Sequence, residues 1–220
     1  MVTVLCLLTL AIAVAGRMIG KSISYAGNTA DRTLHEIVIG DDVLSLPANV
    51  IRFESQRVSG VQNAVDTYFS WPGMHGYSEA RRDVFSQTRS AHGLIFARIA
   101  QATMSRDMSG RFTPIYKRLT DGPPVAGPNG LDSFRLRPGA GYANELMYVE
   151  KAATDRPYAV RCLVEDHGSE LNFTTQTGCQ RDIFIGKDLS VTYRFSIDLL
   201  PHWQQIEADV RKRLELALKK

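Results

Sequence analysis

The run CQRDIFIGKDLSVTYRF, residues 179–195, predicts a β-hairpin. Two segments rich in β-branched and aromatic residues flank Gly186, and a glycine between two such segments is typical of a tight turn. The run TLHEIVIGDDVLSLPANVIRF, residues 33–53, follows the same plan around Gly40. Either a half-domain is duplicated or two hairpins share one turn chemistry; we favour the second, because nothing else repeats.

Further strand-like runs lie between the two hairpins. Glycine, asparagine and proline separate them, which is typical of an antiparallel meander. They cover residues 65–71, 94–100, 134–136, 145–150 and 158–164. Residues 109–119 have helical spacing, although Pro114 limits that helix to a short piece. The segment 121–130 is rich in proline and glycine and predicts a surface loop.

The C-terminal segment predicts an amphipathic helix that packs across the sheet. Asp198 is its expected N-cap, and Pro201 is tolerated in the first turn. One apolar stripe follows at spacings of three and four residues, formed by Trp203, Ile206, Val210, Leu214 and Ala217 or Leu218. The fold class is therefore α+β, a largely antiparallel β-sheet meander with this helix packed on it, plus an N-terminal apolar transmembrane or signal helix.

The N-terminal run VTVLCLLTLAIAVAG, residues 2–16, carries no charge before Arg17. As a helix it would measure about 22 Å, slightly short of a bilayer core, so residues up to Gly20 are needed for an anchor. The alternative is a signal peptide cleaved near Ala15, after a small-x-small site. Arg17 and Lys21 follow the run, and the positive-inside rule alone would keep the domain cytoplasmic. We nevertheless favour export, because of the cleavage-like site and the cysteines.

Cys162 and Cys179 bracket two strand-like runs and predict a disulfide, which requires an oxidising compartment. Cys6 lies within the apolar run and is explained as a small hydrophobic residue. We therefore expect an anchor or signal at residues 1–21, a linker at 22–33 and one periplasmic α+β domain at 34–220. The protein would be a single-pass inner-membrane protein, or would be released to the periplasm after cleavage.

No pattern in the sequence points to catalysis, a cofactor or a metal. The histidines are scattered, and neither a nucleophile elbow nor a phosphate-binding loop occurs. Asp41–Asp42 and Lys187–Asp188 would lie at two hairpin tips, where a cation could bridge them if the tips met. Solvated acids at turns are far commoner, so we expect no metal ligands.

Two segments are candidates for binding a partner. The loop WPGMHGY, residues 71–77, offers Trp71, Met74, His75 and Tyr77, and loops on a rigid sheet often carry binding residues. The simpler interpretation is that Trp71 and Tyr77 pack back into the core. Arg106 and Asp107 form the second candidate, although capping of the following helix is the simpler role for them.

Composition argues against nucleic acid as a partner. The net charge is only +3, and charged residues make up 22% of the sequence. These charges are interspersed, and no basic tract carries interleaved aromatic residues. The expected partners are therefore the membrane, through the N-terminal helix, and a protein of the cell envelope.

The chain as a whole resembles a group of uncharacterised alphaproteobacterial proteins that are described as transmembrane-anchored. The resemblance rests on the apolar N-terminus, on residues 33–53 and 179–195, and on TMSRDMSGRFTPIY at residues 103–116. It implies an inner-membrane tether with a periplasmic domain, and it brings no activity, cofactor or site residue.

These observations favour a membrane-anchored, non-catalytic binding module of the bacterial cell envelope. One alternative is an envelope inhibitor or immunity-type protein that binds a toxin or hydrolase. Another is a hydrolase that acts on an envelope polymer through scattered acids and histidines.

Overall fold

The computed structural model describes residues 27–86, 92–137, 139, 141–142, 144–152, 154–163 and 178–219. The expected anchor or signal at residues 1–21 lies outside these ranges. Within them, no helix has both the length and the apolar character needed to cross a membrane.

The hairpin expected at residues 179–195 forms the middle of the molecule. Strand β10 (Cys179–Ile185) pairs antiparallel with β11 (Leu189–Phe195) from one end to the other. Gly186 makes the turn with φ of +62°, a conformation that residues with a side chain rarely adopt. Alternate side chains of β11 are buried, as a sheet with one covered face requires, and β10 follows the same pattern except that Asp182 is buried as well.

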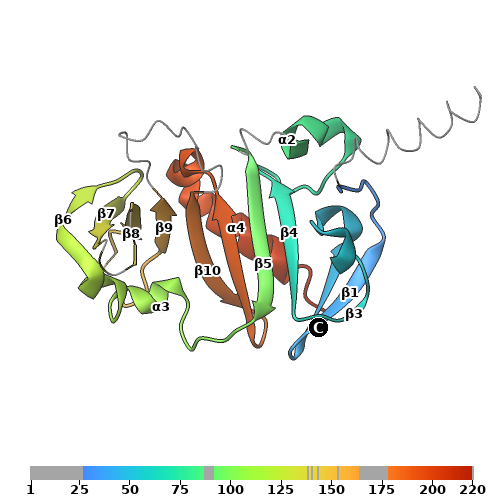
Figure 1. Ribbon diagram of the computed structural model, residues 1–220, viewed down its shortest axis with the longest axis horizontal. Helices are drawn as coiled ribbons and strands as arrows, with labels where there is room; N and C mark the ends of the chain where they lie inside the picture. Colours follow the sequence, from blue (N-terminus) through green and yellow to red (C-terminus); the bar gives the residue numbers. More distant parts are fainter. Residues whose placement is uncertain are drawn as a thin grey trace, which may run out of the picture.

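This hairpin belongs to an eight-stranded sheet in which all neighbours are antiparallel (Figure 1). The mixed α+β class with a large antiparallel sheet is thus confirmed. In spatial order the strands are β4 (Ala64–Ser70), β5 (Leu94–Gln101), β11, β10, β9 (Ala159–Leu163), β8 (Glu145–Glu150), β7 (Leu131–Leu136) and β6 (Thr120–Ala126).

The prediction of a loop at residues 121–130 is wrong over its first half, which forms the edge strand β6. The strand holds two prolines and an exposed face, and its pairing with β7 is interrupted by a bulge between Asp121 and Val125. Prolines are tolerated at a sheet edge because the outer N–H groups have no ladder partner there. The residues that predicted a loop therefore mark an edge strand.

The first hairpin belongs to a separate three-stranded sheet. Strand β1 (Leu34–Ile39) pairs antiparallel with β2 (Asp42–Pro47) and parallel with the short β3 (Gly60–Val61). The chain end adds to this sheet, because Lys219 N donates to Val43 O at 2.8 Å and Ser45 N donates to Ala217 O at 2.8 Å. Short 3-10 turns, η1 (Ala48–Val50) and η2 (Glu54–Gln56), connect β2 to β3.

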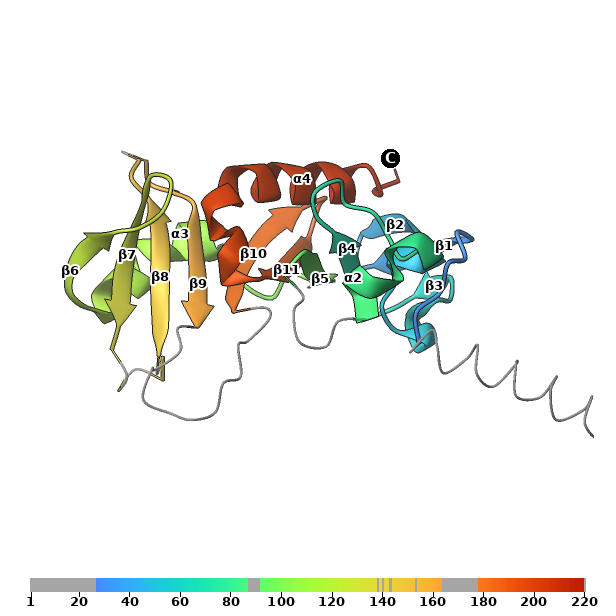
Figure 2. The same ribbon diagram turned by 90° about the horizontal axis from the view of Figure 1, so that it is seen from above.

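Helix α4 (Trp203–Glu215) covers one face of β10, β11, β5 and β4 (Figure 2). The expected stripe is the buried one, with Trp203, Ile206, Val210, Leu214 and Ala217 all in the main core. The predicted N-cap at Asp198 is wrong. A 3-10 turn, η6 (Ile197–His202), precedes the helix, and Ser196 caps that turn by accepting from Asp198 N.

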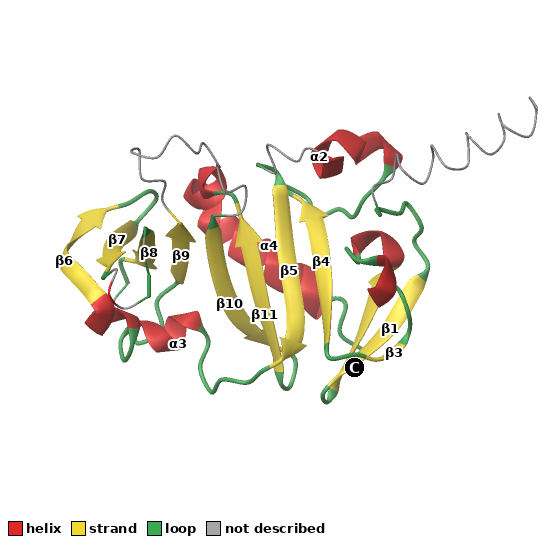
Figure 3. Cartoon of the chain, viewed as in Figure 1, coloured by secondary structure: helices red, strands yellow, loops and turns green. Residues whose placement is uncertain are grey.

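No described helix crosses the opposite face of β10, β11 and β5 (Figure 3). The 3-10 turn η3 (Glu79–Arg81) and helix α2 (Arg82–Ser86) lie near the end of β4, where Phe85 packs edge-on against Tyr68 and Tyr77. One face of the central strands is therefore buried by α4 and the other is open.

A second, smaller core lies between strands β7 to β9 and helix α3 (Met108–Phe112). The helix expected at residues 109–119 is split, because it ends before Pro114 and a 3-10 turn, η4 (Tyr116–Leu119), follows. The buried members of this core are Met108, Phe112, Tyr116, Leu136, Met147, Val149 and Ala159.

The expected disulfide joins the two halves of the large sheet. Cys162 of β9 and Cys179 of β10 lie directly opposite each other, and their sulfur atoms are bonded. Among the described residues, the other β9–β10 partners in register are Arg161 and Gln180. The disulfide therefore joins the two strands whose described pairing is the shortest in the large sheet.

Candidate functional site

Helix α3 lies in a fork of the large sheet. Strands β9 and β10 pair only near the disulfide and then diverge, and α3 contacts both of them. Asp107 begins the helix by accepting from Gly110 N at 3.0 Å. Asp107 is 4% exposed, so the simpler of the two roles considered for it, capping, is the one the structure shows.

A buried arginine, Arg181 of β10, holds α3 and α4 to the sheet. Its Nη1 donates to Ser109 Oγ at 3.1 Å and to Ala159 O at 2.7 Å. Its other nitrogens reach both carboxylate oxygens of Glu207 on α4, at 2.9 and 3.2 Å. A charge this deeply buried is tolerated only with such partners. The network therefore fixes the fork in place.

Glu207 is the acceptor at the centre of this network. Tyr193 Oη donates to it at 2.6 Å and Arg211 Nε at 2.8 Å. Burial alone would raise the pKa of the Glu207 carboxyl. Its hydrogen bond and charge interaction with Arg181, helped by Tyr193 and Arg211, instead hold that pKa below its ordinary value. Glu207 is thus a structural anion with no capacity left for a ligand.

Two further ion pairs set the walls of the fork. Arg111 of α3 pairs with Asp182 of β10, and both side chains are largely buried. Burial raises the pKa of Asp182, and the nearby Arg111 guanidinium offsets part of that effect. Arg156 Nη2 lies 2.9 Å from Asp107 Oδ1, which ties the segment before β9 to the start of α3.

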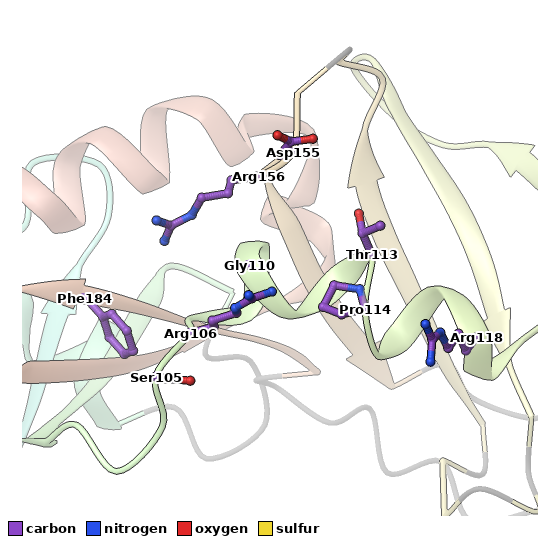
Figure 4. A pocket seen from close by; sticks show the side chains of 9 residues that line it. All are labelled: Ser105, Arg106, Gly110, Thr113, Pro114, Arg118, Asp155, Arg156 and Phe184. Atoms are coloured by element: carbon purple, nitrogen blue, oxygen red, sulfur yellow. The ribbon is translucent and has the colours of Figure 1, made fainter.

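Beside α3 these walls enclose a groove of about 650 Å³, which we call the α3 groove (Figure 4). Its lining contains three guanidinium groups and one carboxylate. The lining residues are Ser105, Arg106, Gly110, Thr113, Pro114, Arg118, Asp155, Arg156 and Phe184.

Arg106 and Arg118 are exposed, and within the described ranges neither guanidinium pairs with a carboxylate. Apolar surface accompanies them, because Met104 is 58% exposed and Ile115 is 46% exposed on the same segment. Arginine beside exposed apolar side chains is typical of protein-binding surfaces. The groove can therefore accept a carboxylate of a partner with charge-assisted hydrogen bonds.

The structure separates the two candidate binding segments. Arg106 and Asp107 lie at or beside the α3 groove next to β10, but residues 71–77 follow the edge strand β4, three strands away from β10. Tyr77 is fully buried and Met74 is 7% exposed. Trp71 packs on the main core and donates from Nε1 to Asp209 Oδ2 at 3.2 Å.

Of the four proposed binding residues in that loop, His75 is the exposed one, and its backbone pairs with Ser70. Trp71 and Tyr77 thus pack inward, as the simpler interpretation supposed, and Met74 does so as well.

One serine, one histidine and one aspartate do approach each other. His92 Nδ1 lies 2.5 Å from Asp198 Oδ2 and 3.4 Å from Ser196 Oγ. A nucleophilic triad needs the serine and the carboxylate on opposite ring nitrogens. Here both face Nδ1, and Ser196 is 3% exposed because it caps η6. The cluster is therefore a capping arrangement.

The two predicted hairpin tips do meet, but their acids bind backbone. Asp42 Oδ2 accepts from Lys187 N at 2.8 Å and from Asp188 N at 3.1 Å, and Asp188 Oδ1 accepts from Asp41 N at 3.4 Å. These amide donors take the place that a bridging cation would have. Over the described part of the chain, no three histidine, cysteine or acidic side chains gather as metal ligands.

The sequence reasoning missed Arg118, Arg156 and Phe184 of the groove. They come from η4, from the segment before β9 and from β10. No spacing in the sequence connects them, because the fork between β9 and β10 brings them together. Only Arg156 had a local signal, since it stands in an Asp-Arg-Pro turn.

No protein-family model matches the chain, and no curated protein matches it. A solved structure is similar to it, that of Smlt3025, an immunity protein of the Stenotrophomonas maltophilia type IV secretion system. The two chains share 16% sequence identity with a TM-score of 0.56, over 86% of this chain and 95% of the other. The likeness extends over nearly all of both chains and shows a common fold.

Proposed function

We propose that the protein is an immunity-type inhibitor of the bacterial cell envelope, which binds a toxic protein stoichiometrically through the α3 groove. The observation that carries this proposal is the pair of guanidiniums, Arg106 and Arg118, exposed in the groove without carboxylate partners among the described residues. Desolvating two unpaired cations is unfavourable unless a partner supplies acceptors. The groove is therefore suited to an acidic protein surface.

The fold comparison supports the choice of partner class. Smlt3025 is an immunity protein, and its fold extends over 86% of this chain. A shared fold by itself does not transfer a function. It favours a toxin over other envelope proteins as the partner, because the groove already calls for protein recognition.

We further propose that the protein acts in the periplasm, tethered to the inner membrane by its N-terminal run. The Cys162–Cys179 disulfide supports an oxidising compartment. An inhibitor placed there would meet an incoming toxin before the toxin reached its target.

Site-specific photo-crosslinking tests the proposal in the cells that produce the protein. A photoreactive amino acid replaces Thr113, which is exposed and lines the groove, or, as a matched control, Gln204, which is exposed on α4. We expect a covalent adduct with one protein from Thr113 and none from Gln204. When produced alone, the captured protein should stop growth, and co-production of the wild-type chain should restore it.

Two results would overturn the proposal. One is the absence of any adduct specific to Thr113. The other is a captured protein that is harmless when it is produced alone.

A further inference from the structure

The open face of the central strands carries its own cluster of charged side chains. Because side chains alternate across a strand, the residues between those buried under α4 point to this face. Several of them line a hollow of about 340 Å³, together with Arg52 and the buried Thr67 and Ala97. Its lining is Arg52, Asp66, Thr67, Phe96, Ala97, Arg98, Gln180, Thr192 and Arg194.

Three arginines share this hollow with one acid. Asp66 is already engaged, because Arg98 Nη1 lies 2.8 Å from its Oδ2 and Gln56 Nε2 donates to the same atom at 2.9 Å. The Arg52 guanidinium stacks 4.9 Å from the centroid of the Phe96 ring. The hollow therefore keeps an excess of positive charge.

Arg194 is the least constrained of these cations. It is exposed, its cross-strand neighbours are Phe96 and Gln180, and no described carboxylate pairs with it. The N–H donors of the Arg194 guanidinium are therefore available to a partner.

The hollow and the α3 groove share one strand. Phe184 of β10 lines the groove, and Gln180 of the same strand lines the hollow. Both side chains lie on the face away from α4, since Arg181, Ile183 and Ile185 between and beside them are buried. The two basic sites therefore meet at the face of β10 that α4 does not cover.

We infer that the two sites together form the docking surface, and that it takes a folded protein with two separate clusters of carboxylates. One cluster would pair with Arg106 and Arg118 in the groove, and the other with Arg194 and Arg52 on the open sheet face. The inference rests on the proposed function and adds the chemistry of its partner. Charge complementarity across two sites fixes the orientation of a partner and speeds its encounter.

A nucleic acid fits this surface less well than an acidic protein does. The carboxylate of Asp155 lines the groove among its arginines and would repel a continuous phosphate backbone, and in the hollow Asp66 already neutralises Arg98. Single-stranded binding also needs exposed aromatic platforms, and Phe96 is half-buried under Arg52.

Titration with a fluorescent oligoglutamate peptide at low ionic strength tests the inference. Arg194→Glu should weaken binding about tenfold, and Arg106→Glu with Arg118→Glu should weaken it by a similar factor. Lys212→Glu, an exposed reversal on α4 with the same change in net charge as Arg194→Glu, should leave binding within a factor of about two. Thermal melting shows whether each variant is folded. Arg194→Gln removes the charge without reversing it and should weaken binding in the same direction.

The outcomes separate the two proposals. Weakening by the groove variants alone overturns the sheet-face inference and leaves the proposed function standing. No binding of the peptide, or equal weakening by Lys212→Glu, overturns the inference as well, while photo-crosslinking at Thr113 still decides the function. Tighter binding of an oligothymidylate of equal charge, lost in Arg194→Glu, would assign the face to nucleic acid and overturn the acidic-protein partner.

Discussion

At the scale of single residues, the contact between Arg181 and Glu207 shows what local sequence cannot reveal. Both sit in ordinary patterns, one in a strand and one on the charged side of a helix. Their pairing depends on α4 crossing β10, and Arg181 is 3% exposed as a result. The disulfide was predictable because, apart from Cys6 in the apolar N-terminal run, the sequence holds two cysteines, so one pairing was available.

Glu207→Gln should destabilise the protein most strongly at neutral pH. The neutral side chain keeps the shape but leaves the Arg181 charge buried without its counter-ion, which costs about 3 kcal/mol. The folded-state pKa of Glu207 lies below the ordinary value of 4.5. Its stabilisation is therefore present above pH 4.5 and is lost as the pH falls through the folded-state pKa.

Urea unfolding of both proteins across this pH range measures the effect. The gap between wild type and Glu207→Gln should narrow as the pH falls below 4.5. Glu215→Gln, on the exposed side of α4, should show little loss at any pH. A gap that stays constant down to acidic pH would show that the Glu207 charge is not what matters.

The glycines at the two hairpin tips are required for their positive φ and also because an aspartate of the other hairpin lies against each of them. A Cβ on Gly186 would lie 2.7 Å from Asp42 Oδ1, and one on Gly40 would lie 2.5 Å from Asp188 Oδ2. Gly186→Ala must displace a carboxylate that holds two backbone amides. Gly130→Ala is the control, with φ of +79° but open space around its Cβ.

We expect Gly130→Ala to cost about 1 kcal/mol from its φ alone. Gly186→Ala should cost at least about twice that, because it also strains or breaks hydrogen bonds of Asp42. Chemical unfolding measures both. Equal losses in the two variants would mean that the meeting of the hairpin tips adds nothing to stability.

At the scale of elements, local pattern predicted the two hairpins and α4 because each buries a periodic apolar face. It failed where an element is stabilised by neighbours distant in sequence. Strand β6 exists because β7 offers a ladder to a proline-rich segment, and η6 displaced the expected start of α4 because Ser196 caps earlier than Asp198.

Loss of the disulfide should destabilise the pairing of β9 with β10. Cys162→Ala with Cys179→Ala opens a loop closed over a sequence separation of 17 residues, which costs about 3 kcal/mol in the chain-entropy model. Wild type unfolded in the presence of a reductant should match the double variant. If the reductant changed nothing in the wild type, the two thiols would be free in solution.

At the scale of the whole molecule, the proposed docking surface is assembled from elements that the chain order keeps apart. The α3 groove draws on α3, η4, the segment before β9 and β10, and the sheet face draws on β4, β5, β10 and β11. Sequence reasoning singled out Arg106 on its own segment. It could not link Arg106 with Arg118 or Arg194, because only the fold puts them on one surface.

The proposal that this surface neutralises a toxin is tested most directly by competition between strains. A strain whose gene carries Arg106→Glu with Arg118→Glu is grown in contact with its parent, beside a second strain that carries Lys212→Glu. The cell number of the strain with Arg106→Glu and Arg118→Glu, relative to its parent, should fall by about tenfold or more, as expected for the loss of two charged contacts. The Lys212→Glu strain should hold its share. Equal persistence of both strains, with each protein present at its normal level, would contradict the account.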